Sequence, residues 1–190
     1  MSNTKAKTKI ETAFAKREEY EIENKASDNK FRELNKAKNA FMHESVQAFI
    51  DAENFDMSFL NTQTNKASRF SVKAALKVAN IMHAIAAKKA DLLDNHTRTI
   101  IEQFAHLADK KRAYDYNELK SMQSASVTTS LSTSLNQDKR KAYDVATLST
   151  QTSSTMQALR VLDLTERDTN EKRKHERVKF SDKRLAFMFK

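Results

Sequence analysis

The chain has 190 residues with no glycine, no proline and no cysteine, and its formal net charge is +9. The absence of cysteine excludes disulfides, thiolate metal sites and cysteine nucleophiles, and the absence of glycine excludes glycine-rich phosphate loops and the Gly-x-Ser-x-Gly elbow. No apolar run approaches the roughly 18 residues of a membrane span, and the first residues lack the apolar core of a signal peptide. We therefore expect a cytoplasmic protein, or one packaged into a larger assembly such as a virion.

A backbone without glycine and proline has few ways to reverse direction, because glycine serves most positive-φ turns and proline breaks most helices. We therefore predict an all-α fold of long helices and few turns, with Asn, Asp and Ser in the turns, arranged as an elongated, coiled-coil-like multi-helix bundle. Hydrophobic residues make up only 39% of the chain, and many of them are alanine. Apolar seams this thin indicate that other copies of the chain, or helical partner proteins, complete the burial.

The first predicted elements are two helices on either side of a break at residues 26–29. Residues 1–26 form a highly charged basic helix with Ile10, Ala13 and Phe14 on its one apolar face. Residues 27–61 form an amphipathic helix with five phenylalanines, for which Ser27 or Asp28 is the expected N-cap. Its apolar face predicts a helix–helix core, with a docking face for a partner as the alternative.

Residues 66–122 form the next predicted element, an alanine-rich region that follows the polar break at 61–65. Ser68 or Ser71 is its expected cap, and the small residues on its apolar stripe allow close approach of neighbouring helices. The pattern leaves open whether this region is one bent helix or a helical hairpin.

Residues 123–164 are rich in Ser and Thr but keep a heptad repeat of apolar positions. The repeat is weakened by Thr152 and Thr155, so it is unlike a strict leucine zipper and is typical of helices packed in a ring or tube. Residues 165–190 are expected to form a solvated basic helix with an apolar end that docks into its own or a neighbouring subunit. The predicted oligomer seam combines the heptad with this end, at Val145, Leu148, Leu159, Leu162, Phe187 and Phe189.

The titratable residues offer no catalytic or metal-binding pattern. None of the five histidines lies at the i, i+4 spacing of a helical zinc pair, and Glu102 and His106 are four apart rather than the three of di-iron bundles. His83 and His106 fall on or near the apolar stripes and are interpreted as core or seam residues. We therefore expect no enzyme activity, no metal and no cofactor.

Positive charge gathers toward the ends of the chain: residues 1–39 carry +3 and residues 160–190 carry +4, against +2 for the long centre. Two clusters also combine cations with nearby aromatic rings, as proteins do when they bind nucleic acid through phosphate contacts and stacking. The expected contacts are electrostatic and independent of base sequence. The candidate residues are Lys110, Lys111, Arg112, Tyr114, Tyr116, Lys172, Arg173, Lys174, Arg177 and Lys179.

Two functions fit these observations best. The first is a non-enzymatic assembly protein that self-associates into a ring, tube or bundle and contacts nucleic acid or an acidic partner through its basic ends. In composition alone the chain is similar to the internal or ejection proteins of tailed phages. The second is a DNA-binding accessory protein, of the nucleoid or DNA-transfer kind, whose helices only display the basic segments. A helical metal-carboxylate enzyme is the third and least supported function.

Overall fold

The computed structural model describes residues 4–65, 68–108, 145–167, 176–179 and 182–189. The chain divides into two compact units, unit 1 (Met1–Asp94) and unit 2 (Asn95–Lys190). The described residues are mainly helical, and their strands form two short antiparallel hairpins. The all-α fold class is therefore confirmed in its general form.

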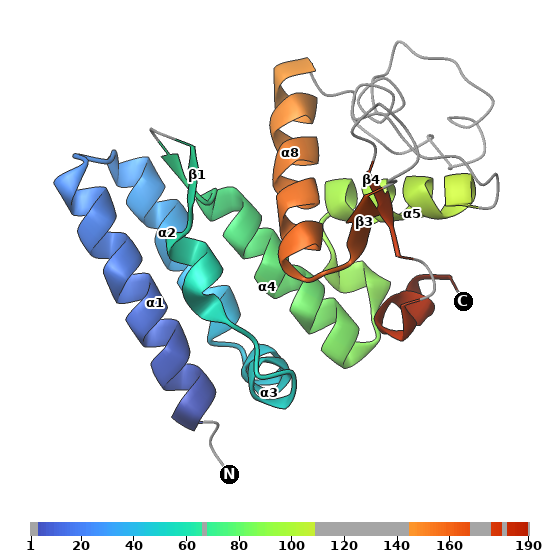
Figure 1. Ribbon diagram of the computed structural model, residues 1–190, viewed down its shortest axis with the longest axis horizontal. Helices are drawn as coiled ribbons and strands as arrows, with labels where there is room; N and C mark the ends of the chain where they lie inside the picture. Colours follow the sequence, from blue (N-terminus) through green and yellow to red (C-terminus); the bar gives the residue numbers. More distant parts are fainter. Residues whose placement is uncertain (1–3, 66–67, 109–144, 168–175, 180–181, 190) are drawn as a thin grey trace. The chain divides into compact units, whose positions relative to one another are not determined.

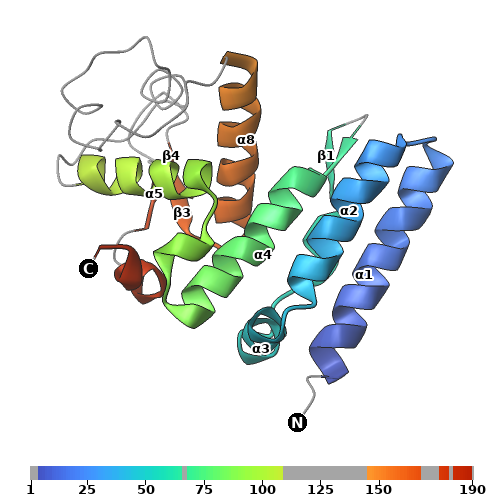
Figure 2. The same ribbon diagram turned by 180° about the vertical axis from the view of Figure 1, so that it is seen from behind.

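Unit 1 is built from helices that pack around one core. In both views of the ribbon, helix α2 lies between α1 and α4 (Figures 1 and 2). The elements are α1 (Thr4–Glu23), α2 (Asp28–Phe41), α3 (Glu44–Ala52), η1 (Met57–Asn61), β1 (Gln63–Asn65), β2 (Ser68–Arg69), α4 (Val72–Ala87) and η2 (Ala90–Leu92).

A chain of aromatic rings holds unit 1 together. Phe14 of α1 contacts Phe41 of α2 at 5.7 Å between ring centroids, and Phe41 contacts Phe59 of η1 at 6.3 Å. Phe59 in turn meets Phe70 edge-on at 5.0 Å and Phe55 at 5.8 Å. Buried aromatic side chains contribute the largest apolar areas to a core. The Phe-rich face therefore forms a helix–helix core, as predicted.

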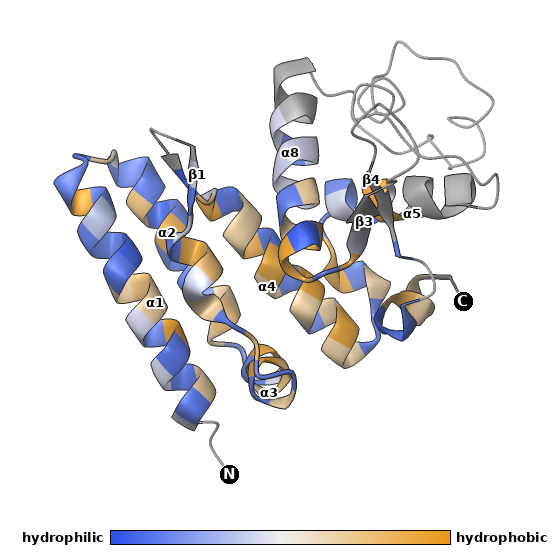
Figure 3. Ribbon diagram, in the orientation of Figure 1, coloured by the Kyte–Doolittle hydropathy of each residue, from blue (hydrophilic) through white to orange (hydrophobic). Residues whose placement is uncertain are grey.

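Helix α4 supplies the other side of this core with small side chains. Ala74, Ala75, Ala79 and Ala84 are fully buried, and α4 packs against both α2 and α3. Figure 3 shows the contrast between α4, which is mainly apolar, and α1, which is mainly hydrophilic. The prediction that alanines allow close helix approach is confirmed here.

The single helix predicted for the Phe-rich region is wrong, because the chain breaks near residue 43. The backbone of His43 is extended (φ −63°, ψ 136°), and its imidazole caps α3 by accepting from the Ser45 amide. Asp56 caps η1 in the same way, through the Ser58 amide. The apolar repeat runs through these breaks because the separate helices bury their apolar faces in one core. Ser27 does occupy the N-cap of α2, although its side chain makes no capping hydrogen bond.

In the ranges that the structure describes, four helix ends carry non-glycine residues with positive φ: Lys25 (51°), Asn54 (45°), Lys88 (54°) and Asp163 (53°). At each end the residue that directly follows donates a backbone hydrogen bond across the last turn, as Lys89 does to the Ala84 carbonyl at 3.0 Å. This is the Schellman arrangement that glycine normally serves, and a side chain there costs about 1 kcal/mol. Only two of the four positions hold the expected Asn or Asp.

The alanine-rich region is not one continuous helix. Ser71 caps α4 by accepting from the Ala74 amide at 3.5 Å, and α4 ends at Ala87 before the left-handed Lys88. The short η2 follows, and α5 (Asn95–Ala108) begins unit 2. The last part of the predicted element, residues 109–122, lies outside the described residues, as do residues 123–144 of the next one.

The described part of unit 2 combines two helices with a hairpin and a terminal turn. Its described elements are α5, α8 (Val145–Val161), β3 (Thr165–Arg167), β4 (Glu176–Val178) and η4 (Lys183–Phe189). β3 pairs antiparallel with β4 in the register Thr165–Val178, Glu166–Arg177 and Arg167–Glu176. The basic helix predicted to begin at residue 165 is therefore wrong where the structure describes it, because residues 165–167 and 176–178 are strands. Asp163 ends α8 in the left-handed region, and the Lys179 amide binds the Leu164 carbonyl at 2.9 Å.

The heptad positions of α8 form a buried face within unit 2. Thr152, Thr155, Leu159 and Leu162 are all at most 2% exposed, and α8 packs against α5 of the same chain. The Thr97 and Thr155 hydroxyl oxygens lie 3.4 Å apart across this seam. These four heptad positions therefore share one buried face in the single chain, and their predicted contact between copies stays a prediction.

Candidate functional site

An open groove of about 970 Å³ runs along α1 in unit 1. We call it the α1 groove. One wall is a face of α1, and the other is formed by the end of α3 and by η1. Its lining residues are Thr4, Lys5, Thr8, Lys9, Thr12, Ala13, Lys16, Asn54, Phe55, Asp56, Met57, Ser58 and Asn61.

The α1 wall is basic because its lysines recur near helical spacing. Lys5, Lys9 and Lys16 all line the groove, and they span about 16 Å along the helix axis at a rise of 1.5 Å per residue. Thr8 and Thr12 lie between them and add hydroxyl groups to the same wall. Within the described part of the chain, Lys5 and Lys16 form no ion pair. The wall therefore offers cations and hydroxyls to a ligand.

The opposite wall is less charged. Lys9 reaches across to it and donates to the Asn54 side-chain oxygen at 2.9 Å. Among the described residues that line the groove, Asp56 is the one carboxylate, and it accepts from the Ser58 amide at 2.9 Å and from the Ser58 hydroxyl. Those hydrogen bonds, helped by the Lys9 charge, hold the pKa of Asp56 below its ordinary value. Asp56 is therefore ionised and engaged at neutral pH, and the groove keeps a net positive charge.

A buried ionic network fixes the two walls to each other. Arg17 and Glu21 are each 1% exposed, and the Arg17 guanidinium donates to Glu21 at 2.7 Å and to the Leu60 carbonyl at 2.6 Å. Lys30 adds an ion pair to the other Glu21 oxygen at 3.0 Å. Charge-assisted bonds of this kind are short and directional. They join α1 to η1 just beyond the groove and hold its width.

Further contacts anchor the second wall. Asn61 donates to the Ala13 carbonyl at 2.9 Å, so the end of η1 is tied to the middle of α1. Arg69 donates to the Asn61 carbonyl at 2.5 Å, and its guanidinium lies 4.3 Å from the centre of the Tyr20 ring. The α1 groove is consequently a preformed surface of unit 1.

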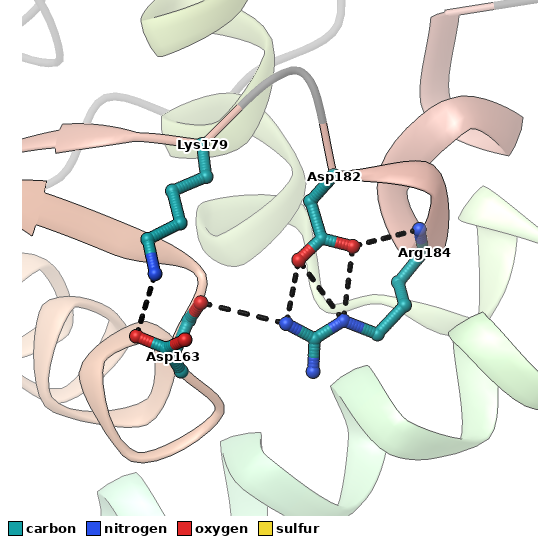
Figure 4. A network of polar contacts seen from close by, with 4 residues as sticks. All are labelled: Asp163, Lys179, Asp182 and Arg184. Atoms are coloured by element: carbon teal, nitrogen blue, oxygen red, sulfur yellow. Dashed lines mark hydrogen bonds and ion pairs between the residues drawn. The ribbon is translucent and has the colours of Figure 1, made fainter.

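Most of the predicted nucleic-acid residues lie outside the described part of the chain. Arg177 lies in β4, opposite Glu166, and its side chain is outside the described residues. Lys179 is described, and its ammonium is paired with Asp163 at 2.7 Å (Figure 4). The residues outside are Lys110, Lys111, Arg112, Tyr114, Tyr116, Lys172, Arg173 and Lys174.

Lys179 belongs to a polar network that closes the end of unit 2 (Figure 4). Asp182 receives the Arg184 amide at 2.9 Å and its guanidinium at 2.5–3.0 Å. The Arg184 side-chain hydrogen bond holds the pKa of Asp182 below its ordinary value. The Arg184 guanidinium also donates to the Asp163 carbonyl at 3.4 Å. These cations neutralise carboxylates of their own unit, which leaves Lys179 less available to a phosphate than the groove lysines.

The predicted seam residues have different surroundings. Leu159 and Leu162 are buried within unit 2, and Phe187 of η4 is half-buried. Val145 and Leu148 lie in α8 and Phe189 ends η4, but their side chains are outside the described residues. Leu185, two residues before Phe187, is 1% exposed, so part of the apolar end is buried within the single chain.

Two histidines of unit 1 lie close together. His43 and His83 lie with their ring centroids 4.0 Å apart, and partial burial together with the neighbouring His43 lowers the pKa of His83. Over the described ranges no group of three potential metal ligands gathers. A search of the same residues for helices that could cross a membrane also finds none.

No family model, curated protein sequence or solved structure matches this chain. The interpretation of the α1 groove therefore depends on the residues that line it. Sequence reasoning placed positive charge at the N-terminal end but did not single out Lys5, Lys9 and Lys16. The signal that would have found them is the recurrence of threonine at 4, 8 and 12 and of lysine at 5, 9 and 16, which puts both residue types on one helix face.

Proposed function

We propose that this chain is a non-enzymatic helical assembly protein that contacts the phosphates of nucleic acid through its basic regions, with the α1 groove as its principal contact. The observation that carries the proposal is three lysines on one rigid wall, opposed by a single carboxylate that is already hydrogen-bonded. Lysines and hydroxyls arranged in this way bind phosphate oxygens without reading bases. Such contacts position a strand and add affinity without sequence preference.

Self-association into a ring, tube or elongated coiled-coil-like bundle remains part of this proposal. Its support is compositional, namely the threonine-weakened heptad and the apolar C-terminal end. In this proposal the seam residues whose side chains lie outside the described set, Val145, Leu148 and Phe189, carry the contact between copies. A virion interior is one location where such a helical, basic protein would meet nucleic acid.

The test is fluorescence anisotropy with a labelled oligonucleotide across a salt series. Replacing Lys5, Lys9 and Lys16 together with glutamine should weaken binding. It should also reduce the slope of log affinity against log salt by about 2, because each phosphate contact contributes about 0.7–0.9. The matched control replaces Lys7, Lys36 and Lys73 with glutamine. These three lysines are exposed and do not line the groove, so the control removes the same charge from outside the groove. Equal losses in the two triple variants would show that net charge, and not the groove, binds nucleic acid.

A specific observation favours the second candidate, a DNA-binding accessory protein without a large assembly. Leu159 and Leu162 are at most 2% exposed in the single chain, so their burial needs no second copy. Size-exclusion chromatography with light scattering separates the two functions. A defined high oligomer at physiological salt without nucleic acid supports the assembly protein, and a monomer or dimer that still binds DNA supports the accessory protein.

A further inference from the structure

The two walls of the α1 groove differ in chemistry, and that difference bears on what kind of nucleic acid fits. The α1 wall carries Lys5, Lys9 and Lys16, whereas the η1 wall carries Phe55 and Met57. Phe55 is half-buried, and its amide is fixed to the Ile50 carbonyl at 2.8 Å. The groove thus has cations on one side and an ordered aromatic ring on the other.

We propose that the α1 groove binds a single strand of nucleic acid in preference to a duplex, with its phosphates along α1 and one base against Phe55. The inference rests on the proposed function, because it presumes that nucleic acid enters this groove. Sites for single strands combine a basic groove that follows the backbone with aromatic rings on which bases stack. Duplex DNA hides its base faces inside the helix and would leave the aromatic wall unused.

The position of Asp56 determines which side of the strand would face each wall of the groove. Its carboxylate is on the η1 wall beside Phe55, and its lowered pKa keeps it charged at neutral pH. A phosphate near that wall would be repelled, whereas a base would not. The backbone is therefore directed toward the lysines and hydroxyls of α1, and the bases toward Phe55.

The dimensions agree with a short stretch of strand. The lysines span about 16 Å, which equals about five stacked steps of 3.4 Å and fewer steps of an extended strand. A volume of about 970 Å³ is at the upper end of ordinary ligand pockets, which hold one small molecule or a few nucleotide units. We therefore infer contacts with about 3–5 nucleotides.

The experiment compares binding of a labelled oligothymidylate 12-mer, a 12-base-pair duplex and a Glu-rich peptide of matched charge to the full-length protein. We expect the single strand to bind at least 10-fold more tightly than the duplex at equal salt. Phe55→Leu should weaken single-strand binding about 5-fold or more, at the low end of the loss for one stacked base, and leave duplex binding unchanged. Phe55→Tyr keeps the ring and should retain the affinity.

Phe31→Leu is the matched control, because Phe31 is another half-buried phenylalanine of unit 1 that does not line the groove. Circular dichroism and thermal melting of each variant show whether the fold is intact. Equal binding of single strand and duplex, with Phe55→Leu neutral, would overturn the single-strand inference and leave the proposed function standing. Binding of neither nucleic acid would overturn both. Tighter binding of the Glu-rich peptide would overturn the inference in favour of an acidic protein partner.

Discussion

Units 1 and 2 bury polar groups in opposite ways. Unit 1 has an aromatic core that encloses one full ionic network, in which Arg17, Glu21 and the Leu60 carbonyl satisfy one another. Unit 2 has a seam in which Thr97 and Thr155 meet across helices α5 and α8. A buried threonine adds one methyl group and a hydroxyl that needs a partner, whereas a phenylalanine adds a large apolar area. We therefore expect unit 1 to be the more stable of the two.

The difference teaches how each unit should fail. A few large contributions stabilise unit 1. Removal of one member of its ionic network therefore leaves a buried polar group without its partner. Many small contributions stabilise unit 2, and its buried large apolar side chains among the described residues are Ile100, Ile101, Met156, Leu159, Leu162, Leu164 and Leu185. Substitutions in each unit therefore test the comparison directly.

The largest effect is expected in unit 2. Leu159→Asp places a carboxylate at a fully buried position, and an unpaired buried charge costs more than about 4 kcal/mol. Hydrogen exchange should show loss of protection in α5 and α8 while unit 1 keeps its protection. Thr150→Asp is the control, because Thr150 is an exposed position of the same helix. If Leu159→Asp only lowers the oligomeric state and unit 2 stays folded, this leucine serves a contact between copies instead.

The next effect is expected at the ionic network of unit 1. Arg17→Ala leaves the Leu60 carbonyl and one Glu21 oxygen without their guanidinium, while Lys30 still pairs with the other oxygen, and should lower the free energy of unfolding by about 3 kcal/mol. Urea denaturation followed by circular dichroism measures it. Arg32→Ala, on the exposed surface of α2, should change stability by less than about 0.5 kcal/mol. Similar values for the two variants would mean that the network adds nothing beyond surface contacts.

A smaller effect, of opposite sign, is expected at a helix end. Lys88 is left-handed with φ 54°, so Lys88→Gly should stabilise unit 1 by up to about 1 kcal/mol through release of backbone strain. Lys36→Gly is the matched control, because Lys36 is exposed inside α2 and glycine there should destabilise by about 1 kcal/mol. Thermal melting of both variants measures the two changes in stability. A destabilised Lys88→Gly would show that the lysine side chain itself supports this turn.

The smallest effect is a pH dependence confined to unit 1. Because the pKa of His83 is lowered in the folded protein, the unfolded chain binds this proton more readily. The stability contribution is complete above the unfolded pKa of about 6.5 and is lost as pH falls below it. The lowered pKa values of Asp56 and Asp182 make stability depend on pH in a more acidic range, and the lowered pKa of Lys77 does so at alkaline pH. His83→Gln should therefore flatten the stability profile between pH 6.5 and 5, and an unchanged slope would exclude the histidine pair as its source.

Local patterns in the sequence were enough for several features of the fold. The spacing of Thr152, Thr155, Leu159 and Leu162 indicated one buried helix face, and the five phenylalanines indicated a core. The α1 groove could have been predicted in part, from the recurrence of Thr and Lys at helical spacing on one helix face. Its second wall could not, because residues 54–61 reach α1 only through contacts far apart in the chain.

The sequence by itself determined that the protein is helical, because a helix repeats every 3.6 residues and the apolar residues follow that period. Only the tertiary structure decided what each face meets. It placed α5 against the heptad of α8, joined Arg17 to a carbonyl 43 residues away, and broke the Phe-rich region at His43. The physical reason is that periodicity is a property of neighbouring residues, whereas partners are chosen by the burial and hydrogen bonding of residues that are distant along the chain.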